Sequence, residues 1–166
     1  MLSKEMEKIL NNQVKLEAES SMNYLAMASW AECQPGLDGI TEFFYAQSEE
    51  ERIHMIKLLR YINERGGTGQ VPELKKPSVK YKTVQDLFKH FLASEIAVTK
   101  SIYDIVDLSF REKDFATHNF LQWYVTEQME EEKSARDLND KLEMIGSDKS
   151  GLYLFDRDIM NLRTAE

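Results

Sequence analysis

The placement of helix-breaking residues limits the fold more than any other feature of this sequence. The 3 prolines and 7 glycines lie in or beside three stretches, at 34–39 (QPGLDG), 65–78 (RGGTGQVPELKKPS) and 147–151 (SDKSG). With a weaker break at 111–114 (REKD), they leave four long segments and one short one, at about 5–33, 39–65, 83–111, 115–146 and 152–163. Each long segment repeats apolar residues three or four positions apart, as on one helix face, and shows no strand-like alternation. The sequence therefore predicts an all-α fold.

The lengths of the connections predict how the helices are arranged. Short breaks join the first segment to the second and the third to the fourth, which favours two antiparallel hairpins. The link at 66–82 has about 17 residues and could span about 55 Å when extended, more than a helix of about 40 Å. We expect a four-helix bundle with a long crossover between the second and third helices, plus a short C-terminal fifth helix, in a single domain over 1–166. Asp38 is the expected N-cap of the second helix.

Composition excludes several classes of function. The formal net charge is −8, whereas binding to nucleic acid needs a basic surface, so no nucleic-acid partner is expected. No apolar run has the length of a membrane span and no signal-peptide pattern begins the chain, so no membrane association is expected. Cys33 is the only cysteine, which rules out an intramolecular disulfide. A reducing, cytoplasmic location is expected.

Polar residues interrupt the apolar face of every long segment near its middle. They are Glu17 in the first, Glu51 and His54 in the second, Glu95 in the third, and Gln128 and Glu131 in the fourth. The layout repeats, because 78 residues separate Glu17 from Glu95 and 77 residues separate each member of the second pair from its counterpart in the fourth segment. This repeat predicts a pseudo-two-fold bundle with all six groups in one layer.

The chemistry of these six groups favours a metal site. Four neighbouring buried carboxylates cannot all remain ionised without a partner, because each would cost several kcal/mol or take up a proton. Two divalent cations would balance the four negative charges, and oxygen donors with one imidazole suit iron or manganese. Taken alone, His54 would be explained better as a hydrogen-bonded core histidine than as a metal ligand. The matched acids on the other helices favour metal ligation by Glu51 and His54.

The sequence around these positions resembles that of ferritins of the non-haem bacterial or archaeal type. The resemblance covers nearly the whole chain, through the stretches LNNQVKLEAESSMNYLAMASW, EEERIHM, NFLQWYVTEQMEEEK and GLYLFDRDI. Ferritin-like carboxylate bundles carry a Glu on each of two helices and Glu-x-x-His on each of the other two. Here Glu51-x-x-His54 is intact, whereas the fourth segment has Gln128-x-x-Glu131.

The resemblance implies iron storage and detoxification by a ferroxidase. Such a protein oxidises Fe(II) with O2 or H2O2 at a di-iron centre and deposits ferric mineral inside a homo-oligomeric shell of 24 subunits. It implies that Glu51 bridges two irons. The other residues with implied roles are Glu17 and His54 at the first iron, Glu95 and Glu131 at the second, Gln128 beside the oxygen-binding position, Tyr24 as a hydrogen-bonding electron donor, and Glu50, Glu127 and Glu130 at a third iron.

Differences from related families argue against a haem group, and two alternatives to an iron-storage ferroxidase are left. Bacterioferritin has Glu-x-x-His in its fourth helix and a haem-ligating Met directly after the bridging Glu, where this chain has Arg52, so no haem is expected. A di-iron oxygenase or reductase subunit with an organic substrate is one alternative, although that class usually keeps both histidines. A structural subunit without oxidase activity is the other, although the complete ligand set speaks against it.

Overall fold

The computed structural model describes residues 1–78 and 80–162, and within them every regular element is a helix. The helices are α1 (Lys4–Glu32), α2 (Asp38–Glu64), α3 (Val84–Arg111), α4 (Phe115–Ile145) and α5 (Lys149–Leu162). The predicted all-α class is confirmed, and the four long helices begin and end within a few residues of expectation. The fifth begins at residue 149 instead of 152, and its expected last residue, 163, lies outside the described part.

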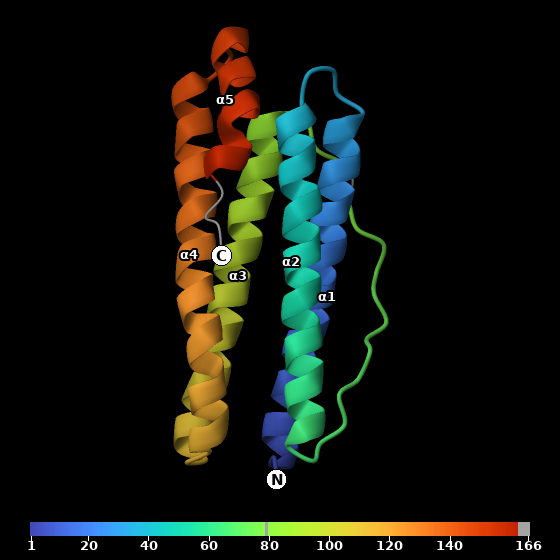
Figure 1. The fold of residues 1–166 in the computed structure, drawn as a ribbon, viewed down its shortest axis with the longest axis vertical. Helices are drawn as coiled ribbons and strands as arrows, with labels where there is room; N and C mark the ends of the chain where they lie inside the picture. Colours follow the sequence, from blue (N-terminus) through green and yellow to red (C-terminus); the bar gives the residue numbers. More distant parts are fainter. Residues whose placement is uncertain (79, 163–166) are drawn as a thin grey trace.

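The topology is the predicted one. The helices α1 and α2 run antiparallel as one pair, α3 and α4 form the other, and the link between α2 and α3 extends along the bundle from one end to the other (Figure 1). This crossover makes α2 and α3 parallel. The short α5 packs at one end against α2 and α4. The fold is thus a four-helix bundle with a short C-terminal helix.

Apolar side chains fill the bundle in two clusters, one toward each end. The first contains Tyr24, Phe44 and Phe91, and it includes Phe155 of α5, whose ring packs against Phe88. The second contains Met6 and other buried residues of α1, together with buried residues of α2, α3 and α4. On every long helix, the polar residues that interrupt the apolar face lie in sequence between the members of these two clusters. The packing therefore leaves a polar layer near the middle of the bundle.

The start of α2 differs from expectation. Asp38 is the first residue of the helix instead of its N-cap, and the residue in the cap position offers no side-chain hydrogen bond. Asp156 of α5 caps α2 instead, accepting hydrogen bonds from the backbone N–H of Gly39 at 3.0 Å and of Ile40 at 2.8 Å. A Cβ at position 39 would lie 1.8 Å from the Asp156 carbonyl oxygen, so only glycine fits. This contact fixes α5 to the beginning of α2.

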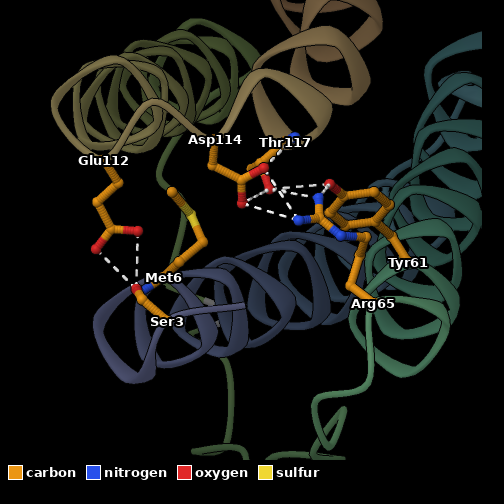
Figure 2. A network of polar contacts seen from close by, with 7 residues as sticks. All are labelled: Ser3, Met6, Tyr61, Arg65, Glu112, Asp114 and Thr117. Atoms are coloured by element: carbon orange, nitrogen blue, oxygen red, sulfur yellow. Dashed lines mark hydrogen bonds and ion pairs between the residues drawn. The ribbon is translucent and has the colours of Figure 1, made fainter. Parts of the chain in front are cut away.

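At the opposite end, a polar network ties the helix ends together (Figure 2). Arg65, directly after α2, donates to Asp114 in the α3–α4 turn at 3.0 Å and also to the Tyr61 hydroxyl. Ser3, the N-cap of α1, donates to the Glu112 carboxylate at 2.7 Å. These contacts join both helical pairs at the end remote from α5. No helix in the part of the chain that the structure describes is long and apolar enough to cross a membrane.

Candidate metal centre

The six polar side chains predicted to form a layer are all buried. Their exposed fractions range from 0% for Glu95 to 7% for Glu131. Each of the four long helices supplies at least one of them, and the pairs on α2 and α4 are three residues apart, which places both members on one helix face. The bundle therefore encloses four carboxylic acids, one imidazole and one amide.

The part of the layer on α1 and α2 has the spacing of a cation site. One ligand atom from each of Glu17, Glu51 and His54 lies within 4.8 Å of the other two. Oε2 of Glu17 and Oε2 of Glu51 are buried and make no hydrogen bond within the described residues. Buried polar atoms without partners are costly, and a cation would satisfy both oxygens at once. These residues fit a divalent metal ion.

The part of the layer on α3 and α4 is tied by hydrogen bonds. Glu95 accepts from the Tyr24 hydroxyl and, at 2.7 Å, from Nε2 of Gln128. Glu131 accepts from Nε2 of Gln47 at 3.0 Å. Tyr24 thus makes a hydrogen bond within the layer, and Gln128 is oriented as a donor. Both carboxylates are held in place without a metal ion.

Burial makes these acids weak. It raises the pKa of Glu95 to about 7, against the opposing effect of hydrogen bonds from Tyr24 and Gln128. Burial also raises the pKa of Glu131 and of Glu51 well above the usual carboxyl range, and neighbouring carboxylates add to both effects. For Glu51 these neighbours are Glu17, Glu95 and Glu131, so its carboxyl group is electrostatically close to all three. Binding of cations would displace any protons that these carboxyl groups hold.

A second group of candidate ligands adjoins the first. Ligand atoms of Glu50, His54 and Glu127 lie within 4.8 Å of one another, and the two acids are half-buried. Glu130, predicted to belong with Glu50 and Glu127, is exposed and is not part of this group. His54 takes part in both groups, so its imidazole lies between the deep layer and the half-buried acids.

Two buried amides in the layer were not predicted from the sequence. Gln13 is 0% exposed and donates to Oε1 of Glu17 at 2.7 Å, and Gln47, 2% exposed, donates to Glu131. Each lies four residues before a predicted ligand, Glu17 or Glu51, and so shares its helix face. These two amides could have been identified from the sequence as polar residues that lie one helical turn before Glu17 and Glu51.

Comparison with known proteins gives the family. A model of the ferritin-like domain matches residues 7–145. The chain is 41% identical to the bacterial non-heme ferritin of Campylobacter jejuni, with 98% of this chain and 96% of that protein covered. It is 40% identical to a probable bacterial non-heme ferritin-like protein of Haemophilus influenzae, with 99% of each chain covered.

Solved structures agree with this result. An open pore ferritin from the hyperthermophilic archaeon Archaeoglobus fulgidus is 39% identical, with a TM-score of 0.94 over 99% of this chain and 100% of that one. A ferritin of Chlorobium tepidum is 40% identical, with a TM-score of 0.87 over the full length of both chains. The likeness thus extends over sequence and fold together. The resemblance noted in the sequence is confirmed, and this chain belongs to the ferritin family.

Proposed function

We propose that this chain, acting as one domain over residues 1–166, is an iron-storage ferroxidase. The observation that carries the proposal is the buried layer of four carboxylic acids and an imidazole, in which Glu17 and Glu51 each keep an oxygen without a hydrogen bond. A layer of this kind is costly to bury unless cations occupy it. Membership of the ferritin family supports iron as the cation and storage as the role.

In this proposal iron is the substrate, and two Fe(II) ions bind side by side. Glu17, Glu51 and His54 hold one, and Glu51, Glu95 and Glu131 hold the other, with Glu51 bridging. The electrostatic proximity of Glu51 to the other three acids supports the bridging role. Two ions neutralise the four carboxylates when all are ionised, which favours binding of the pair over binding of one.

The oxidation step transfers two electrons to one oxidant. Each Fe(II) loses one electron, and O2 accepts both with two protons to give H2O2, or H2O2 accepts both with two protons to give two water molecules. Paired transfer avoids release of one-electron oxygen radicals. Tyr24 and Gln128 both donate to Glu95. In this proposal the oxidant binds beside Gln128, and Tyr24 is the candidate donor of a further electron.

Release of the product follows from the ligand type. Carboxylates can change between bridging and terminal binding, so they can hand on ferric ions for deposition as a ferric oxyhydroxide mineral. The group of buried His54 with half-buried Glu50 and Glu127 is the candidate third iron position on this route. We propose a cytoplasmic, homo-oligomeric shell of 24 subunits that encloses the mineral, without haem and without a nucleic-acid partner.

One comparison of variants tests this function. Excess Fe(II) is added in air to the wild type and to the double variant Glu51→Ala/His54→Ala, and iron and protein are measured across a size-exclusion column. The wild type should oxidise iron rapidly and carry far more than three irons per subunit in a very large particle. The double variant should keep the particle and lose rapid oxidation.

A second double variant serves as the matched control for Glu51→Ala/His54→Ala. Glu49→Ala/His90→Ala makes the same chemical changes at exposed positions of α2 and α3 and should behave as wild type. Undiminished oxidation in the Glu51/His54 variant would refute the site assignment. About two irons per subunit on a small oligomer would favour a di-iron enzyme with an organic substrate. Storage without oxidation in the wild type would favour a structural subunit.

A further inference from the structure

A chain of two hydrogen bonds connects α3 to the Glu17 carboxylate on α1. The hydroxyl of Ser101 donates to Oε1 of Gln13 at 2.5 Å, and Nε2 of Gln13 donates to Oε1 of Glu17 at 2.7 Å. Gln13 and Glu17 are 0% and 1% exposed. Water is therefore kept away from both side chains, and these bonds fix their positions.

The chemistry of the groups decides which way the Gln13 amide faces. The NH2 group of Gln13 faces Glu17, because it is the donor in their hydrogen bond and a carboxylate oxygen is the acceptor. The amide oxygen then faces Ser101, whose hydroxyl can donate. Each bond thus enforces the other. Without Ser101, nothing else in this chain of contacts would hold the amide in the orientation that Glu17 needs.

The consequence for Glu17 is that its two oxygens differ. Oε1 is occupied by Gln13, whereas Oε2 makes no hydrogen bond within the described residues. Glu17 also supplies one ligand atom to the group that includes Glu51 and His54. The carboxylate is therefore arranged to offer a single oxygen toward these residues.

We propose that Gln13, oriented by Ser101, is a positioning residue that makes Glu17 a one-oxygen ligand of the first metal ion. Gln13 itself does not touch the metal. Its loss would let the Glu17 carboxylate rotate, and removal of such outer contacts typically lowers metal affinity by about 10- to 100-fold. The inference rests on the proposed function, because it presupposes that Glu17 binds a metal ion.

The test uses two variants and a matched control in the assembled, metal-free protein. Gln13→Met keeps the length of the side chain and removes the amide, and Ser101→Ala removes only the group that orients it. Ser109→Ala is the control, because Ser109 is a buried α3 serine whose hydroxyl donates to its own helix, at the Val106 carbonyl oxygen. Co(II) is the probe, followed by calorimetric titration and by its visible absorption spectrum.

The expected result is a selective loss at one of two Co(II) positions. Gln13→Met should weaken one ion by about 10-fold or more, with a changed Co(II) spectrum. Ser101→Ala should weaken the same ion by a smaller factor, and Ser109→Ala should match the wild type. In iron oxidation, Gln13→Met and Ser101→Ala should both need more Fe(II) than the wild type to reach half of their maximal rate. At saturating Fe(II), both should approach the wild-type rate.

Contrary outcomes separate this inference from the function on which it rests. Wild-type affinities and spectrum in Gln13→Met would overturn the positioning role, even if that variant unfolds at a lower temperature, because a merely structural amide would give that pattern. If Gln13→Met fails to fold, wild-type affinities in Ser101→Ala would overturn it equally. A wild-type protein that binds no Co(II) pair would overturn the proposed function as well.

Discussion

The two helical pairs carry the same layout of polar residues, but equivalent positions differ in residue type and in hydrogen bonding. In the α1–α2 pair, Glu51 is a carboxylate with one oxygen that makes no hydrogen bond in the described residues. Its counterpart in the α3–α4 pair is Gln128, an amide that donates to Glu95. The position of His54 is taken by Glu131, which accepts from Gln47. In one half of the layer, Glu17 and Glu51 each keep an oxygen without a hydrogen bond, whereas both acids of the other half accept hydrogen bonds from amide side chains.

This difference implies that the two metal positions are not equivalent. The first would be formed by side chains that already lie close together, with one oxygen each of Glu17 and Glu51 that makes no hydrogen bond in the described residues. The second requires Glu95 to exchange protein donors for a metal ion. We therefore expect the first position, near Glu17 and His54, to fill before the second.

The largest effect is expected from Glu51→Gln, which gives both halves an amide at the equivalent position. The change removes the carboxylate proposed to be shared by both ions, so rapid Fe(II) oxidation should fall by more than about 100-fold, beyond the range for outer contacts. Stopped-flow absorbance measures the rate. Glu49→Gln, an exposed neighbour, is the control. A Glu51→Gln rate within about twofold of wild type would show that Glu51 is not a shared ligand.

The reverse change, Gln128→Glu, makes the halves alike by adding an acid. It replaces the amide that donates to Glu95 with a second buried acid, so the two carboxyl groups must either take up a proton or repel each other, and the metal-free protein should lose about 3 kcal/mol of unfolding free energy. Zn(II) should restore much of this loss. Thermal unfolding with and without Zn(II) measures both effects, and Gln122→Glu, on the exposed side of α4, should change little. Equal stability of Gln128→Glu and wild type without metal would contradict the account.

The third prediction concerns pH and the metal-free protein. The pKa of Glu95 is raised from about 4.5 to about 7, so between these values the folded state binds more protons than the unfolded state. The free energy of unfolding must then fall as the pH rises through this window. Glu95→Gln does not titrate, so its stability relative to wild type should grow by on the order of 2 kcal/mol across the window. A relative stability independent of pH would refute the assignment.

The smallest effect is expected far from the layer, at the contact between α5 and α2. Asp156→Ala removes the cap from the start of α2 and should cost about 1 kcal/mol of unfolding free energy. Because this contact lies outside the metal layer, Co(II) affinity and Fe(II) oxidation should stay at wild-type values. Chemical denaturation and calorimetric titration check the two parts separately. Weakened metal binding in Asp156→Ala would mean that stability, and not local donors, sets the difference between the halves.

The sequence predicted the bundle and the layer because both depend on helical periodicity. Acids that fall on apolar faces are conspicuous, since burying a charge is costly. The supporting amides Gln13 and Gln47 were missed, because a neutral amide on an apolar face is a weaker signal than a charge, and contacts such as Gln47 with Glu131 join residues far apart in the sequence. The same holds for Asp156, whose partners lie more than a hundred positions away in the chain.

One residue shows the limit of placing side chains from sequence neighbourhood. Glu130 was predicted to join Glu50 and Glu127, but it directly precedes Glu131, and one residue of helix turns the side chain by about 100°. With Glu131 facing the layer, Glu130 is exposed. His54 lies close to Glu50 and Glu127 instead. Acids that are close in sequence were thus distributed between the interior and the surface.

Locating the metal ions would test directly whether two ions share Glu51 in the buried layer. Crystals of the full chain, soaked with Fe(II) without oxygen, would be measured by anomalous diffraction at the iron edge. We predict two peaks flanking the Glu51 carboxylate, one beside Glu17 and His54 and the other beside Glu95 and Glu131. Peaks confined to the half-buried group around Glu50 and Glu127, with none beside Glu51, would contradict it.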